Sequence, residues 1–334
     1  MTMSPSHRET LEAFGYTPEE AHFLYLVATH SGYFMARHYL AFTGAHPGKR
    51  TTLFRAKLQA NKHVRTECFP KHGVVYHVFA RKLYRHLGRE NLGNDREHEI
   101  EYIQRHLAIL DFVLAHRRLD FLETEQDKCR YFEQICGIAP HRFPSKSYPG
   151  HTGSQPIVRY FGDRFPMYLD SFVSPPVLTF SFIQRGEANL AEFLRHLKTY
   201  LPLFRELAAF RFIYLARTEA HFDKAREHFD SLVTIALGVN PAGDLLRYFG
   251  VRKAWDDRRY NALSEADLIF RNRAQRRFGA PRFEGMYGGW KTGRITDTQV
   301  REELAGNGTR HDVQFEPRLL AAVGANRPEA ERNQ

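Results

Sequence analysis

Apolar residues recur at helical spacing in the stretch that starts at Thr17. Thr17-Pro18-Glu19-Glu20 is a typical helix start, with a hydroxyl at the N-cap, proline at the first helical position and acids in the first turn. Phe23, Leu24, Leu26 and Val27 then recur on one helix face. This pattern predicts a helix that ends near Ser31-Gly32.

Two more helices and a hairpin are predicted after it. A short helix runs from Met35 to Phe42, and a third runs from about Lys49 to Gln59. Strand-like runs from Val64 to Phe69 and from Val74 to Phe79 flank the turn Pro70-Lys71-His72-Gly73. Three helices followed by a hairpin are the element order of a winged helix-turn-helix, which we therefore expect over residues 15–89.

The third predicted helix is two-sided. Leu53, Phe54 and Leu58 are expected to form its apolar side, and most of the other positions are basic or polar. In a winged helix the third helix enters the major groove and the hairpin tip lies along the DNA backbone. Arg50 and Arg55 are the candidates for bidentate pairing with guanine. The predicted DNA contacts are Arg37, Lys49, Arg50, Thr51, Thr52, Arg55, Lys57, Lys71 and His72.

Charge is concentrated in the same stretch. From Arg37 to Arg89 there are twelve Lys and Arg and one acid, Glu67, so this segment carries +11 while the whole chain carries +10. Such asymmetry favours a polyanionic partner, and double-stranded DNA is the commonest one. A solvated basic face without a partner is the alternative.

The pattern changes after the basic segment. A helical connector is predicted over residues 90–136, and residues 137–240 alternate between strand-like and helical runs. This alternation predicts an α/β sheet with parallel pairing through crossovers. The strand-like runs are Ile157–Phe161, Met167–Asp170, Val177–Ile183, Phe212–Ala216 and a short one at Val233–Leu237; the helical runs are Ala188–Leu207 and Glu219–Leu232.

Residues 241–334 are expected to form a helical and irregular extension. Ser264 caps a predicted helix that runs to about Phe278, and a loop rich in glycine, aromatic and basic residues follows over residues 279–291. Its Tyr287 and Trp290 either pack against the body of the protein, which we favour, or stack on a base. Residues 320–334 are expected to be a frayed tail.

The order of these elements resembles the replication-relaxation-type proteins of plasmids and conjugative elements. The resemblance covers about residues 15–235 and depends mainly on strand order. Such proteins pair a winged helix with a domain like the PD-(D/E)XK nucleases, which implies a restriction-endonuclease-like sheet here. The residues that carry it are Met167-Tyr168-Leu169-Asp170, Leu178 to Gly186, the helix containing Lys198 and Tyr200, and Phe212 to Ala216.

The nuclease chemistry that this resemblance implies is incomplete. Asp170 is available as a first carboxylate for Mg²⁺, but the next strand offers Thr179, Ser181 and Phe182 where a second acid is needed. Glu187 lies past the end of that strand. We therefore expect an inactive nuclease-like domain with no catalytic residues, no metal and no cofactor.

Other classes of protein lack support in the sequence. There is no phosphate-binding glycine loop, nucleophile elbow or dinucleotide fingerprint, no run long enough to span a membrane, and no signal-peptide core at the N-terminus. The three cysteines, Cys68, Cys129 and Cys136, have no CxxC spacing and are expected to be buried, reduced thiols of a cytoplasmic protein.

The sequence thus predicts an α+β protein that binds specific double-stranded DNA. The resemblance places it in a mobile genetic element, where it would act in replication, transfer or transcriptional control without being an enzyme. A metal-dependent nuclease and a winged helix that binds another protein are the alternatives. We expect no membrane and no small-molecule substrate, and we leave a homodimer open.

Overall fold

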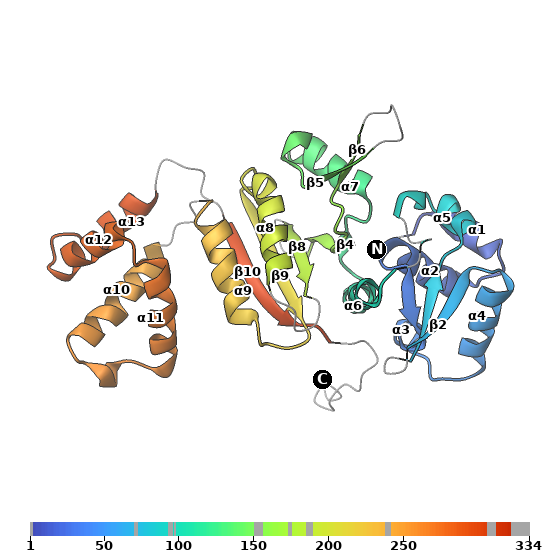
Figure 1. Cartoon of the computed structure of the whole chain (residues 1–334), viewed down its shortest axis with the longest axis horizontal. Coiled ribbons are helices and arrows are strands. Elements are labelled where there is room, and N and C mark those ends of the chain that lie inside the picture. Colours follow the sequence, from blue (N-terminus) through green and yellow to red (C-terminus); the bar gives the residue numbers. More distant parts are fainter. Residues whose placement is uncertain are drawn as a thin grey trace. The chain divides into compact units, whose positions relative to one another are not determined.

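A computed structural model describes residues 3–69, 73–92, 96, 98–149, 156–172, 176–184, 190–237, 242–305 and 312–321. The chain mixes helices and strands, as expected (Figure 1). It divides into two compact units. The first comprises Met1–Leu190, Arg211–Phe222 and Glu316–Gln334, and the second comprises Ala191–Phe210 and Asp223–Phe315.

The first elements match the predicted order closely. Besides the expected helices and hairpin, the structure has a helix and a strand that the sequence pattern did not predict, α1 and β1. The strands form an antiparallel sheet in the order β1-β3-β2. The elements are α1 Pro5–Glu12, α2 Pro18–His30, β1 Tyr33–Met35, α3 Ala36–Thr43, α4 Lys49–Ala60, β2 Val64–Phe69 and β3 Gly73–Val78. We call residues 18–78 the N-terminal region.

Aromatic side chains hold the N-terminal region together. The ring of Tyr39 in α3 stacks on Phe54 in α4 at 4.3 Å between centroids, and Phe34 in β1 stacks on Tyr76 in β3 at 4.9 Å. Phe23 in α2 contacts both pairs. Local signals fix the helix ends, since Thr17 and Glu20 form a reciprocal capping box at the start of α2.

A long helix, α6, completes this core. The segment after β3 contains α5 Arg81–His86, a 3-10 turn Glu90–Leu92, α6 Ile100–Ala115, β4 Asp120–Phe121, α7 Glu125–Arg130 and a π-helical turn Tyr131–Ile135. Leu110 and Leu114 of α6 join the core of the N-terminal region, and Ile103 and Leu107 pack against Tyr33 and Val75 of its sheet.

The second sheet has five strands in the order β10-β9-β8-β7-β4. Its strands are β7 Met167–Asp170, β8 Val177–Ile183, β9 Ala209–Ala216 and β10 Asp312–Leu319, together with β4. β8 and β9 are parallel and are separated in sequence by helix α8 Ala191–Phe204, whereas β7 is antiparallel to both β4 and β8. The sheet is therefore mixed, and the predicted crossover pairing applies to β8 and β9.

Several expectations for this part of the chain need correction. The predicted strand at Ile157 is β6 Ile157–Tyr160, which pairs with β5 Ser145–Tyr148 in a separate ribbon after a 3-10 turn Pro140–Arg142. The strand expected at Val233–Leu237 is wrong, because this segment continues α9 Phe222–Phe229 as a π-helical turn, Asp230–Thr234.

β10 was not predicted. It lies at the edge of the sheet. Proline is tolerated in an edge strand, because the backbone N–H that Pro317 lacks is not needed for a hydrogen bond within the sheet.

Four helices form a core of their own in the second unit. They are α10 Ala242–Asp256, α11 Glu265–Arg277, α12 Pro281–Lys291 and α13 Asp297–Ala305, with a 3-10 turn Tyr260–Ala262 before α11. The loop predicted over residues 279–291 is thus wrong, because most of it is α12. Tyr287 donates to Asp256 and Trp290 to Asp297, both at 2.7 Å, so these rings pack within the unit. At Gly289 a Cβ atom would lie 2.5 Å from the end of the Ile295 side chain, so any larger residue here would force Ile295 to move.

The cysteines are free, but Cys68 and Cys136 are exposed, so the expectation of buried thiols is wrong for these two. No helix among the described residues is long and apolar enough to cross a bilayer.

Candidate DNA interface on helix α4

Helix α4 buries one face and exposes another. The buried face consists of Thr51, Phe54 and Leu58, which recur at intervals of three and four residues. Leu53 is 51% exposed, so its assignment to the apolar side is wrong. One residue is a rotation of about 100° along a helix, which carries Leu53 away from Phe54 and out of the core. Thr51, a predicted DNA contact, faces the core instead.

The exposed face of α4 is basic at its start, carries the exposed side chain of Leu53, and otherwise consists largely of small side chains. Lys49 and Thr52 lie in the first turn, and Ala56 and Ala60 continue the same face. Thr52 donates its hydroxyl to the Gly48 carbonyl at 3.3 Å. Small side chains leave the helix backbone accessible to a close partner along this face.

One flank of α4 faces two acids of α2. Arg50 forms an ion pair with Glu19, and both side chains are partly exposed. Lys57 lies 2.7 Å from the Glu20 carboxylate, which is almost fully buried and also accepts the capping hydrogen bond from Thr17. Two of the predicted DNA contacts are therefore neutralised within the protein.

The opposite flank faces the hairpin and carries no such acid. The guanidinium of Arg55 lies over the ring of Tyr76 in β3, 5.4 Å from the centroid. This cation–π contact orients Arg55 without removing its charge. Among the described residues no carboxylate lies within ion-pair distance of Arg55 or Lys49, so these two cations stay open to a polyanion.

Arg37, another predicted contact, is tied into the fold. Its guanidinium donates to both carboxylate oxygens of Asp111 in α6, and His38 lies 3.0 Å from the same group. Burial alone would raise the pKa of Asp111, but hydrogen bonds from His38 and Arg37 outweigh it and lower that pKa. Arg37 therefore joins α3 to α6.

Four ion pairs reduce the charge of the basic segment. Arg37, Arg50, Lys57 and Arg89 each pair with an acid that lies outside Arg37–Arg89 in the sequence; for Arg89 the acid is Glu123 at 3.0 Å. The sum of +11 for the segment thus overstates the charge that faces solvent. Lys71 and His72, the predicted contacts at the hairpin tip, lie outside the described residues.

The described residues of the expected nuclease-like centre are engaged in contacts within the fold. Asp170 ends β7, and its carboxylate lies 3.2 Å from the guanidinium of Arg211 in β9. The two hydroxyls of β8 are already satisfied, since Ser181 donates to the Pro166 carbonyl at 2.6 Å and Thr179 donates to the Val177 carbonyl at 3.4 Å. Glu187 lies outside the described residues. Within the part of the chain that is described, no three His, Cys, Asp or Glu side chains gather as a metal site.

Sequence reasoning missed the acids that face α4 and also a pocket around Lys128. The acids had a signal, since Glu19 and Glu20 open a predicted helix, but their contact with α4 depends on tertiary packing.

No protein-family model, curated protein or solved structure matches this chain.

Proposed function

We propose that the chain is a sequence-specific double-stranded DNA-binding protein, with a winged helix over residues 15–89 and α4 as its recognition helix. The element order and the sheet order β1-β3-β2 support this proposal. The resemblance to replication-relaxation-type proteins adds the context of a mobile genetic element, with a role in replication, transfer or transcriptional control.

The exposed face of α4 is the observation that carries the proposal. Lys49 and Arg55 remain without carboxylate partners among the described residues, and Leu53, Ala56 and Ala60 are exposed on the same helix. A helix of this kind fits the major groove, where Arg55 would pair with guanine and Lys49 would contact phosphate. Lys71 and His72 would contact the backbone from the hairpin tip.

Noncatalytic binding is favoured over DNA cleavage. Asp170 is engaged by Arg211, and a carboxylate in an ion pair across a sheet is a poor start for a Mg²⁺ site, which needs several oxygen ligands in octahedral geometry.

The proposal is tested by selecting a binding sequence from random duplexes and then comparing variants. Arg55→Ala should weaken binding to the selected sequence by about 1–3 kcal/mol and relax the preference at one or two positions, as expected for a lost bidentate base contact. Lys49→Ala should weaken all sequences about equally and lower the salt slope by about one.

Lys224→Ala is the matched control, because Lys224 is an exposed cation of α9 outside the proposed domain. It should bind as the wild type does. The proposal fails if no sequence is enriched, or if Arg55→Ala and Lys224→Ala bind the selected duplex equally well.

A further inference from the structure

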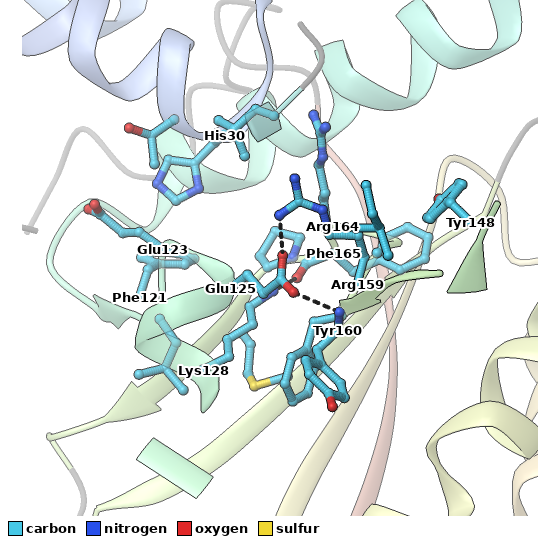
Figure 2. Close-up of a pocket in the computed structure, with 18 of the residues that line it drawn as sticks. His30, Phe121, Glu123, Glu125, Lys128, Tyr148, Arg159, Tyr160, Arg164 and Phe165 are labelled. Atoms are coloured by element: carbon cyan, nitrogen blue, oxygen red, sulfur yellow. Dashed lines mark hydrogen bonds and ion pairs between the residues drawn. The ribbon is translucent and has the colours of Figure 1, made fainter. Parts of the chain in front are cut away.

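A pocket of about 420 Å³ lies within the first unit (Figure 2). Its walls come from the end of α2, from the segment around β4 and α7, and from the β5–β6 ribbon with the residues that follow it. This volume falls in the range of pockets that hold small organic molecules.

A buried lysine lines this pocket. Lys128 of α7 is only 5% exposed, and its ammonium group makes one long hydrogen bond, 3.4 Å to the Phe165 carbonyl. The ring of Phe161 lies 5.8 Å away. None of the described carboxylates forms an ion pair with it, although Asp163 attracts it electrostatically. Burial lowers the pKa of Lys128, because the charged form is poorly solvated there.

An unsatisfied histidine lines the same pocket. His30, at the end of α2, is 9% exposed, and its Nε2 has no hydrogen-bond partner. Burial, with the charges of Arg89 and Lys128, lowers the pKa of His30 to about 3, so its ring is neutral at physiological pH. A neutral imidazole with its proton on Nε2 is a hydrogen-bond donor for an anion.

The acids that line the pocket are already engaged. Glu125 accepts from the Tyr160 amide at 2.8 Å and from Arg159 at 3.3 Å (Figure 2). Glu123 accepts from Tyr25 and from Arg89. Four cationic residues line the pocket, compared with these two carboxylates: Arg96, Lys128, Arg159 and Arg164.

Aromatic rings form much of the remaining wall. Phe121, Phe161 and Phe165 are buried, whereas Tyr148 is 42% exposed. Flat apolar surfaces beside buried cationic groups suit a ligand with a planar ring and one anionic group.

From this arrangement we infer that the pocket binds a small organic anion, with its phosphate or carboxylate at Lys128 and His30 and its planar ring against the aromatic wall. This site is distinct from the exposed face of α4 and adds a small-molecule ligand to the proposed DNA-binding function. The residues of this site come from segments far apart in the sequence, so no local sequence motif predicts the site.

Isothermal titration calorimetry with two probes tests the inference and separates the two anionic groups. Deoxyadenosine monophosphate supplies a ring with a phosphate, and salicylate supplies a ring with a carboxylate. At least one should bind the wild-type chain saturably and more tightly than its neutral counterpart, deoxyadenosine or salicylamide. Lys128→Met should weaken that binding roughly tenfold to a hundredfold, the loss expected for a hydrogen bond to a charged group.

Two control variants locate the binding. Lys224→Met removes an exposed cation of α9 that does not line the pocket and should leave the affinity unchanged. Arg55→Ala should also leave it unchanged, which separates this pocket from the proposed DNA interface. Without ligand, Lys128→Met should be at least as stable as the wild type, because it removes a buried charge that lacks an ionic partner.

The wild-type titration does not depend on any variant and can refute the inference by itself. No saturable binding of either probe at millimolar concentration overturns it. Equal binding of the anion and its neutral counterpart also overturns it, as does an unchanged affinity in Lys128→Met.

Discussion

The N-terminal region and the five-stranded sheet treat their charged residues differently. On α4, Glu19 and Glu20 neutralise one flank, while Lys49 and Arg55 have no carboxylate partner among the described residues. In the sheet, Asp170 pairs with Arg211. Surface cations without a carboxylate partner can bind a polyanion, whereas charges that form ion pairs within a sheet stabilise the fold.

The strands of these two regions are also assembled differently. The three strands of the N-terminal region all lie within residues 33–78. The five-stranded sheet contains strands that are far apart in sequence, with β4 at Asp120 on one edge and β10 at Asp312 on the other. The N-terminal region also contains buried histidines whose pKa is lowered by burial, and these make it the more sensitive of the two to acid.

Acid should destabilise the N-terminal region first, and this is the largest effect we expect. Burial lowers the pKa of His30 from 6.5 to about 3, and that of His63 to about 4. It also lowers to about 3 the pKa of His106 in α6, whose ring is hydrogen-bonded to the Ser31 carbonyl at the end of α2. Because the folded pKa values are lowered, stability is complete above pH 6.5 and is lost as the pH falls towards them. At pH 5 the two most deeply buried of these histidines, His30 and His106, should each cost about 2 kcal/mol, from about 1.4 kcal/mol for each pH unit.

Hydrogen exchange with mass spectrometry, corrected for the intrinsic pH dependence, would locate that loss. Peptides from α2 and β3 should lose protection between pH 6.5 and pH 5, before peptides from β8 and β9. If both regions lost protection together, or if neither changed above pH 4.5, the histidines would not distinguish them.

Removing Asp111 should be the most damaging single substitution. The carboxylate is 1% exposed and holds both Arg37 and His38. Asp111→Ala should lower the free energy of unfolding by about 3–5 kcal/mol, because two donors lose their buried acceptor. Urea titration of the purified variants would measure this change.

Glu284→Ala provides a matched comparison in the second unit. It breaks another two-point contact between a carboxylate and an arginine, Arg252, but Glu284 is 46% exposed. Its cost should be about 1 kcal/mol or less. Similar losses for the two variants would mean that Asp111 does not anchor α3 to α6.

The difference between local and long-range contacts explains which elements the sequence predicts. Thr17, Pro18 and Glu20 are adjacent in the chain, so the start of α2 is visible in the pattern and is confirmed by the capping box. β10 was missed because an edge strand with a proline has a weak signal of its own and needs β9 beside it.

Candidate site residues are likewise predicted where the signal is local and missed where it depends on tertiary packing. Lys49 and Arg55 are recognisable from helical spacing, and the structure leaves them exposed. The pairing of Arg50 with Glu19 depends on how α2 packs against α4, which spacing does not encode. The pocket at Lys128 is less visible still, since a single lysine in a helix pattern predicts a solvated side chain.

Substitution of Asp170 tests whether its ion pair with Arg211 serves the fold and not catalysis. Purified protein with Mg²⁺ or Mn²⁺ should not cut linear, supercoiled or single-stranded DNA above a mock preparation. Asp170→Ala should leave DNA affinity nearly unchanged and lower stability by about 1 kcal/mol, because its ion pair with Arg211 is partly exposed. Gel assays and urea titration measure these outcomes.

Arg211→Ala should reproduce the loss of stability, since it breaks the same pair from the other side. Metal-dependent cleavage that disappears in Asp170→Ala would overturn the noncatalytic proposal. It would direct attention to Glu187 as a second metal ligand.

The smallest expected effect concerns Glu19, which sharpens the contrast between the two flanks of α4. Glu19→Gln releases Arg50 from a partly exposed ion pair, so stability should change by less than about 1 kcal/mol. If Arg50 contacts a base, its release should strengthen binding to the selected duplex more than binding to random DNA. If Arg50 only balances Glu19, the loss of one negative charge should strengthen both about equally.

A double-mutant cycle with Arg50→Ala separates these two outcomes, because it measures the coupling between Glu19 and Arg50 in free and DNA-bound protein. We expect Arg50→Ala to abolish the sequence-dependent part of the gain from Glu19→Gln and to leave the general part. A gain that stays sequence-dependent without Arg50 would assign the effect to another residue. In that case Arg50 would belong with Arg37 among the cations that serve the fold, and Arg55 would be the remaining candidate for reading a base on α4.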